Sequence, residues 1–175
     1  MRYICDMHFM PRLMALPTLI FLSACAPAAA PDPQIAAPVA VERVRFTISS
    51  WGQPQRAWTL EADGSLLVET KADGQPFHSY DLDQRRTTLS AEDAAAVRAA
   101  LAPARRPLPS CTVMLTDGPS MFIHWTGATE QNVSVYFGCR EQAFRPVIES
   151  AMSADARVGE AVANVPISGK RHIGP

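Results

Sequence analysis

Alternation of apolar and polar residues begins near residue 43 and predicts a run of short β-strands. Val44, Phe46 and Ile48 alternate with polar residues, a pattern typical of a strand with one buried face. Asp63-Gly64 predicts a type I′ hairpin between two such segments, because both residues tolerate a positive φ. The strands expected in this first part of the chain cover residues 43–49, 57–62, 65–70 and 76–82.

Helical spacing follows these strands and then recurs near the C-terminus. Ser90 is suited to cap a helix that runs to about Ala102, and apolar residues between Phe144 and Ala151 indicate a second helix. Further strands are expected between the two helices, at 111–116, 121–126 and 132–137. The order of elements predicts one small α+β domain with antiparallel sheet, in two halves that each consist of strands followed by a helix. The domain is expected to cover residues 43–163, followed by a flexible tail at 164–175.

The segment before this domain has the organisation of a cleaved signal peptide. Arg2 and Arg12 precede the apolar run 13–22, and small residues then lead to Cys25. This run is too short to span a bilayer, which takes about 20 apolar residues. Residues 1–24 are therefore predicted to be a targeting segment rather than part of the fold.

Leu22-Ser23-Ala24-Cys25 resembles the lipobox of bacterial lipoproteins. In that family the chain is cut before the cysteine, which then carries acyl chains such as palmitate. The resemblance implies that Cys25 is the lipid attachment site and the membrane anchor of the chain. Ala26 stands where lipoproteins retained at the inner membrane usually have Asp, so the implied location is the outer membrane, facing the periplasm. The Pro/Ala-rich residues 25–42 are then a tether.

Composition and motifs narrow the range of functions for the folded part. Sixteen Lys and Arg against seventeen Asp and Glu, with no basic run, argue against nucleic-acid binding. The chain has no Gly-rich phosphate loop, serine-hydrolase elbow or His-Glu-x-x-His motif, so no cofactor and no metal is predicted. Strand alternation also separates His78 from Asp81 and Asp83, which argues against a metal site there.

Cys111 and Cys139 are the two cysteines of the expected domain. The oxidising compartment implied by the lipobox favours a disulfide between them. In a three-stranded meander, however, they would lie about 20 Å apart, and a disulfide needs Cα atoms within about 7 Å. Either the pair is not bonded, or residues 111–119 are no hairpin arm and return beside the end of the 121–137 hairpin. A third interpretation makes Cys139 a nucleophile with His124 as its base.

Trp51, Trp58 and Trp125 are either core residues or an exposed surface for a protein or glycan partner. Trp51 is the one most expected to be exposed, because it lies in a turn. The sequence thus predicts a lipid-anchored envelope protein with a non-catalytic binding or inhibitor-like domain, whose partner is an envelope protein or a cell-wall component. The alternatives are a small periplasmic hydrolase or thiol enzyme that uses Cys139 and His124, and an envelope assembly subunit.

Overall fold

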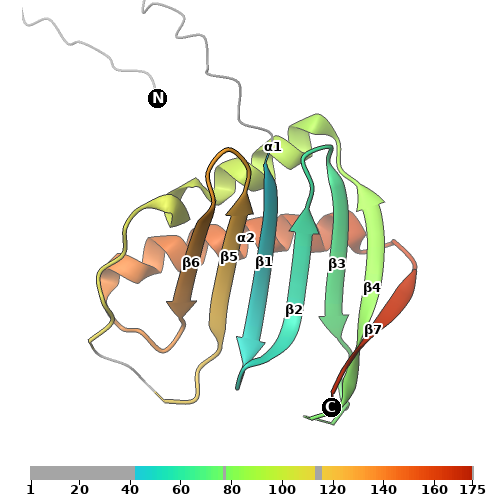
Figure 1. Cartoon of the computed structure of the whole chain (residues 1–175), viewed down its shortest axis with the longest axis horizontal. Helices are drawn as coiled ribbons and strands as arrows, with labels where there is room; N and C mark the ends of the chain where they lie inside the picture. The colour runs from blue at the N-terminus through green and yellow to red at the C-terminus, as the bar shows by residue number, and fades with distance from the viewer. Residues whose placement is uncertain (1–41, 77, 113–115, 175) are drawn as a thin grey trace, which may run out of the picture. The chain divides into compact units, whose positions relative to one another are not determined.

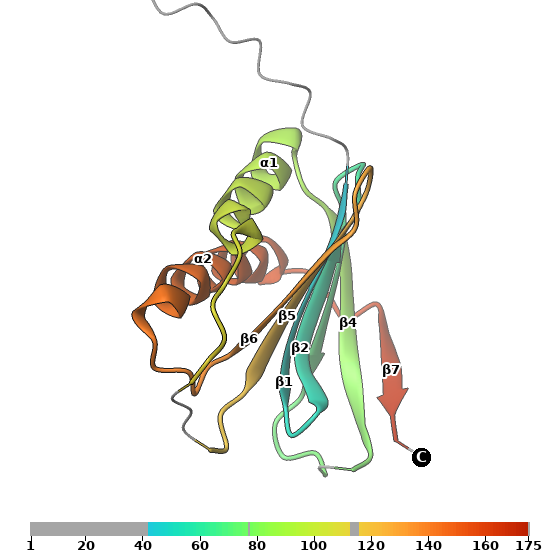
Figure 2. The ribbon, with the colours of Figure 1, turned by 60° about the vertical axis from the view of Figure 1, so that its left-hand side comes forward.

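The computed structural model describes residues 42–76, 78–112 and 116–174. In this part of the chain, seven strands form one antiparallel sheet, and both α-helices pack on the same face of it (Figures 1 and 2). The expected signal peptide 1–24, the lipobox with Cys25, and the tether up to residue 41 lie outside the described residues. None of the described helices is long and apolar enough to cross a membrane.

The strands are β1 (Arg43–Ser50), β2 (Gln53–Leu60), β3 (Ser65–Lys71), β4 (Tyr80–Thr88), β5 (Ser120–Thr126), β6 (Gln131–Tyr136) and β7 (Gly169–Ile173). The helices are α1 (Ala91–Ala100) and α2 (Arg145–Val162), with short 3-10 helices η1 (Ala102–Arg105) and η2 (Gln142–Phe144) before β5 and α2. The α+β class with antiparallel sheet is therefore confirmed, with more strand than helix.

The sheet has the strand order β6-β5-β1-β2-β3-β4-β7. Strands β1 to β4 form successive hairpins, and β5 then pairs with the free side of β1, where Phe46 lies opposite Ile123. The second part of the chain thus extends the sheet that the first part begins. The predicted two halves share one sheet and one core, and the last described element is a strand rather than a helix.

The hairpin at Asp63-Gly64 and the helix start at Ser90 are confirmed. The predicted type I′ turn is wrong, because Asp63 does not have a positive φ. Gly64 has a φ of +90° in the β2–β3 hairpin, and a Cβ there would lie 2.9 Å from the carbonyl oxygen of Leu89. Only glycine fits both the backbone conformation and this close approach. Helix α1 begins at Ser90 as expected, where the Ser90 hydroxyl accepts the backbone N–H of Asp93 at 3.0 Å.

The core lies between the sheet and the two helices. Phe46 stacks on Trp58 with ring centroids 5.1 Å apart. Trp58 and Trp125 are each 1% exposed, so the interpretation of these two residues as a binding surface is wrong. Their register explains the burial, because Trp58 lies opposite Phe46 and Trp125 lies opposite Val44, on the face that the helices cover.

A partly buried ion pair joins α2 to the sheet. The Arg56 Nε on β2 donates to both carboxylate oxygens of Asp155 on α2, at 2.7 and 2.9 Å. The indole N–H of Trp58 donates to the same carboxylate at 3.0 Å. Asp155 therefore fixes the position of α2 over β2, a contact between residues 99 positions apart in the chain.

Two sequence-based boundaries differ from the structure. The fourth strand covers Tyr80–Thr88 rather than residues 76–82. The expected flexible tail at 164–175 instead contains β7, which pairs with β4. Ionic contacts hold this strand: Lys170 Nζ lies 3.6 Å from Asp83, and Arg171 Nε lies 2.6 Å from Glu69. Strand β7 pairs with the edge of β4 that β3 leaves free.

Candidate functional site

The face of the sheet opposite the helices has no layer over it in the described part of the chain (Figure 2). Near its middle it carries the small residues Ala57 and Thr59, which are buried although no helix covers them. Longer side chains of the neighbouring strands enclose them. We call this surface the open face.

Strand register brings distant residues into one row on the open face. Arg45 lies opposite Thr59, Thr59 opposite Leu67, and Leu67 opposite Arg86. A cleft of about 480 Å³ lies over this row and the start of β1. The residues that line it are Arg43, Arg45, Thr59, Glu61, Ser65, Leu66, Leu67, Arg86, Thr87 and Thr88. We call it the arginine cleft.

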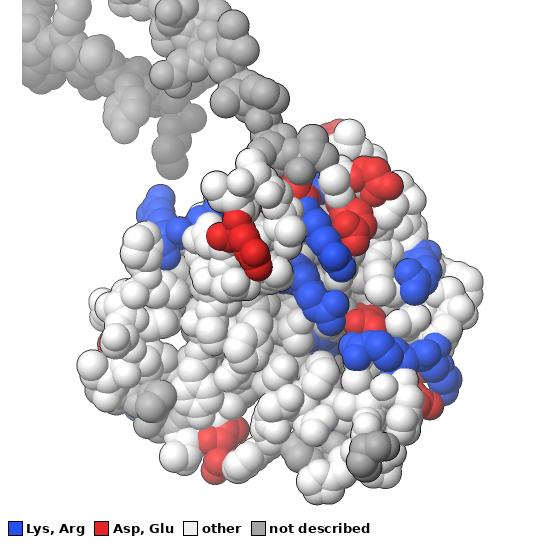
Figure 3. Space-filling view, viewed as in Figure 1, with Lys and Arg blue, Asp and Glu red and all other residues white. Residues whose placement is uncertain are grey.

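Positive charge exceeds negative charge among the lining residues. Arg43 pairs with Glu61 at 3.2 Å, and both side chains are about half exposed. Arg86 has one long contact, 3.5 Å from Nη2 to the Gln84 side-chain oxygen, and forms no ion pair with any described carboxylate. Figure 3, which looks onto the open face, shows the basic side chains as a diagonal band with acidic side chains beside it. The cleft is thus locally basic on a chain whose net charge is -1.

Glu69 borders the arginine cleft but has its own partners. It is 4% exposed and accepts hydrogen bonds from Arg171, at 2.6 and 3.0 Å, and from Gln84 at 3.0 Å. Burial alone would raise the pKa of this carboxyl, but the hydrogen bonds and the charges of Arg171 and Arg45 outweigh it and hold the pKa below its usual value.

The Glu69 oxygens already accept hydrogen bonds from Arg171 and Gln84, so Glu69 makes only a long contact with Arg45, which lines the cleft. The Arg45 Nη2 lies 3.8 Å from its carboxylate, beyond the usual range of a charge-assisted hydrogen bond of about 2.7–2.9 Å. The guanidinium donors of Arg45 therefore remain available to another anion.

No protein-family model and no curated protein matches this chain. The chemistry of the site therefore follows from its residues. The lining contains no histidine and no cysteine, and its one carboxylate, Glu61, is paired with Arg43. Such a lining can hold an anion.

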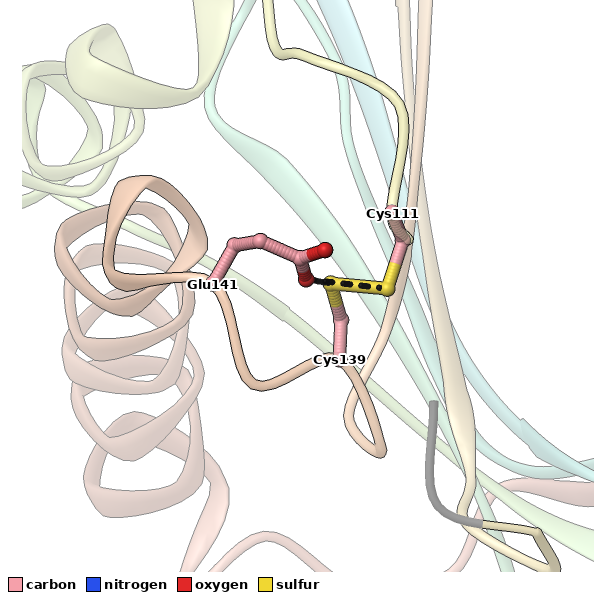
Figure 4. A group of neighbouring side chains, drawn as sticks. All are labelled: Cys111, Cys139 and Glu141. Atoms are coloured by element: carbon pink, nitrogen blue, oxygen red, sulfur yellow. Dashed lines mark hydrogen bonds between the residues drawn. A yellow bond between two sulfur atoms is a disulfide. The ribbon is translucent and has the colours of Figure 1, made fainter. Parts of the chain in front are cut away.

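Cys111 and Cys139 form a disulfide with their Cα atoms 5.9 Å apart (Figure 4). Residues 111 and 112 belong to no strand, contrary to the strand predicted at 111–116, of which residues 113–115 lie outside the described part. The chain instead returns beside the end of the β5–β6 hairpin, where the Phe137 N–H donates to the Pro119 carbonyl at 2.9 Å. This is the arrangement that the spacing argument required for a bonded pair.

The disulfide removes the thiol that the thiol-enzyme hypothesis needs. Cys139 belongs to the core on the helix side, whereas His124 lies on the open face and contacts Glu130 at 2.8 Å. Glu141 points toward both sulfurs (Figure 4), with its Oε2 2.5 Å from the Cys139 Sγ. The three side chains have the spacing of a metal-ligand group, but the bond between the sulfurs leaves no thiolate to bind a metal.

Trp51 is 69% exposed at the tip of the β1–β2 hairpin, as its place in a turn predicts. Its φ is 51°, an uncommon conformation for a bulky residue, and Gly52 follows with a φ of 75°. This turn is at the opposite end of β1 from Arg43, so Trp51 does not line the arginine cleft.

Pairing of β4 with β7 produces a cluster that the sequence did not indicate. The His172 Nδ1 lies 3.0 Å from Asp81, and its Nε2 lies 3.5 Å from the Ser79 hydroxyl. The atoms follow the order of a Ser–His–Asp triad. The side chains of His172 and Asp81 are 60% and 39% exposed, however, so water screens the charges that a triad uses.

Sequence reasoning missed the arginine cleft as well. The arginines at positions 43 and 45 were visible as polar residues on the same face of a strand. These two arginines line one cleft with Arg86 because of the register of three hairpins, and the local sequence pattern does not predict that register.

Proposed function

We propose that this chain is a lipid-anchored protein of the bacterial cell envelope, held at the outer membrane through Cys25, whose domain binds an anionic partner on its open face. The observation that carries the binding role is the arginine cleft, where three arginines and one paired carboxylate line a hollow. A concave surface with more arginines than carboxylates is suited to bind an anion from outside the protein.

The lipobox supports the anchor, and the chain order relates it to the cleft. Residues 25–42 would form the tether, and the first residue after them, Arg43, lines the cleft. The cleft therefore lies at the end of the domain where the tether joins it. A binding site there would receive a partner close to the anchored end of the domain.

The anchor is tested by replacing Cys25 with Ser and following the protein in membrane and soluble fractions. Loss of label from a fatty-acid analogue, together with release from the membrane, is the expected result. If the variant stays labelled and membrane-bound, Cys25 is not the anchor.

The binding role is tested by photo-crosslinking in intact cells. A photoreactive residue at Thr88, at the mouth of the arginine cleft, is expected to give a discrete adduct. The same residue at Met152, which is exposed on α2 on the other side of the domain, is the matched control. The adduct at 88 should disappear when Arg45 and Arg86 are both replaced by Gln. Equal adducts from 88 and 152, unaffected by the arginine changes, would refute the proposal.

One observation favours a second candidate function, hydrolysis by Ser79, His172 and Asp81. In the first step the His172 Nε2 takes the proton of the Ser79 hydroxyl, whose oxygen attacks an ester carbonyl, and the proton then goes to the departing alcohol. Water then attacks the acyl-serine while His172 takes a proton from it and returns the proton to Ser79, which releases the acid. The exposure of the cluster makes binding the better-supported function. A fluorophosphonate probe decides this point: labelling of the protein that is lost in Ser79→Ala would support hydrolysis, and no labelling would exclude it.

A further inference from the structure

The balance of charge in the arginine cleft indicates the charge of its ligand. Three arginines and one glutamate line it, and the glutamate neutralises Arg43. Two positive charges, those of Arg45 and Arg86, remain with only long contacts at 3.8 and 3.5 Å. A carboxylate would neutralise one of them, whereas a phosphomonoester carries about 1.5 to 2 negative charges at pH 7.

The donors in the cleft also suit phosphate. A guanidinium presents five N–H donors in a planar fork that matches the oxygens of a phosphate group. Arg45 and Arg86 approach the cleft from β1 and β4, at the two ends of one row across the sheet. The hydroxyls of Thr59 and Thr88 line the same space and can donate to further oxygens.

The size of the cleft calls for more than a phosphate group. Its volume of about 480 Å³ falls within the range of small-molecule sites, roughly 300–1,000 Å³. Leu67 lies in the row between Thr59 and Arg86, where it offers apolar surface beside the charged donors. The organic part of a ligand can rest against this side chain.

We infer that the arginine cleft binds a phosphomonoester of a small polar organic group, with Arg45 and Arg86 on the phosphate and Leu67 against the organic part. This inference rests on the proposed function, since it names the class of ligand for the same site. A soluble sugar phosphate and the phosphorylated headgroup of a membrane lipid share this chemistry.

The test compares ligands that share one sugar and differ in the group at its C6. The full-length lipidated protein, held in neutral detergent micelles, is titrated with glucose 6-phosphate, glucose 6-sulfate and glucose while binding is measured by calorimetry. Glucose 6-phosphate is expected to bind at least about tenfold more tightly than the singly charged sulfate, and glucose should not bind. Equal affinities for glucose 6-phosphate and glucose 6-sulfate overturn the inference. So does the absence of binding by both glucose 6-phosphate and the phosphomonoester lipid of the second arm, phosphatidic acid.

A lipid arm identifies the source of the phosphate. Short-chain phosphatidic acid, a phosphomonoester, and short-chain phosphatidylglycerol, a phosphodiester, are added to the same micelles. Tighter binding of phosphatidic acid than of glucose 6-phosphate assigns the site to a lipid headgroup, and the reverse assigns it to a soluble ligand. Either result supports a phosphomonoester site.

Variants show whether the cleft is responsible. Arg45→Gln and Arg86→Gln are each expected to weaken the preferred phosphate probe about tenfold. Arg157→Gln removes the same charge from an exposed position on α2 and should leave the affinity unchanged. Equal loss in all three variants would reveal a non-specific charge effect and overturn the inference. Absence of a phosphate preference with retained crosslinks at position 88 refutes only the ligand class, whereas loss of both refutes the proposed function too.

Discussion

The two faces of the sheet use the same residue types for different purposes. On the face covered by the helices, Arg56 is paired with Asp155 at 2.7 Å, and Trp58 satisfies the same carboxylate. On the open face, Arg45 and Arg86 lie near acceptors but have only long contacts with them. Paired charge positions a helix, and charge in excess of its partners forms a site for an external anion.

Glu69 shows that facing solvent does not by itself make a charge available. It lies on the open face, yet it is buried and saturated by Arg171 and Gln84. Its role is structural, because it attaches the edge strand β7 to the sheet. What distinguishes the open face is therefore that guanidinium donors of Arg45 and Arg86 lack close acceptors there, and not only that this face is uncovered.

The largest effect is expected where the covered face is disrupted. Asp155→Ala should lower the free energy of unfolding by roughly 3–5 kcal/mol, because it leaves the partly buried Arg56 guanidinium without its carboxylate and the buried Trp58 N–H unsatisfied. Urea denaturation followed by tryptophan fluorescence measures this loss. A decrease below about 1 kcal/mol would show that the Arg56–Asp155 pair does not hold α2 in place.

Removal of the disulfide should come next. With 28 residues of sequence separation, Cys111→Ser combined with Cys139→Ser is expected to cost about 3 kcal/mol of stability. The bridge lies outside the arginine cleft, so phosphate affinity should be retained below the new unfolding transition. Loss of binding in a variant that is still folded would contradict the separation of the two regions.

A smaller, pH-dependent effect is expected at Glu69. Its pKa is lowered on folding, so its contribution to stability is present above the ordinary value of 4.5 and is lost as the pH falls through the lowered value. Glu69→Gln should cost about 2 kcal/mol at pH 7. The difference from the unmodified protein should shrink as the pH is lowered below about 4.5. A difference that stays constant from pH 7 to pH 3 would show that the carboxylate charge is not what stabilises β7.

The sequence predicted those parts of the fold that depend on neighbouring residues. Alternation predicted β1, Asp63-Gly64 predicted the β2–β3 hairpin, and Ser90 predicted the start of α1, because each signal and its effect lie within a few residues. The strand β7 was missed, since its short polar sequence acquires order only from pairing with β4 and from the contact of Arg171 with Glu69.

The candidate site depends on longer-range information still. Trp58 and Trp125 could be assigned to the core only once the register with β1 was known. Likewise, Arg45 and Arg86 are 41 positions apart and meet at one cleft through three consecutive strand pairings. The Cys111–Cys139 pair was the exception, because the chemistry of the expected compartment made a long-range prediction that geometry then confirmed.

The smallest change in stability should accompany the clearest change in binding, and Arg86→Gln tests this most directly. Arg86 is exposed and forms no ion pair with a described carboxylate, so the free energy of unfolding should change by less than about 0.5 kcal/mol. In the same preparation, calorimetry should show affinity for glucose 6-phosphate or short-chain phosphatidic acid reduced about tenfold. Unchanged affinity, or a loss of more than about 2 kcal/mol in stability, would contradict the assignment of Arg86 to ligand binding.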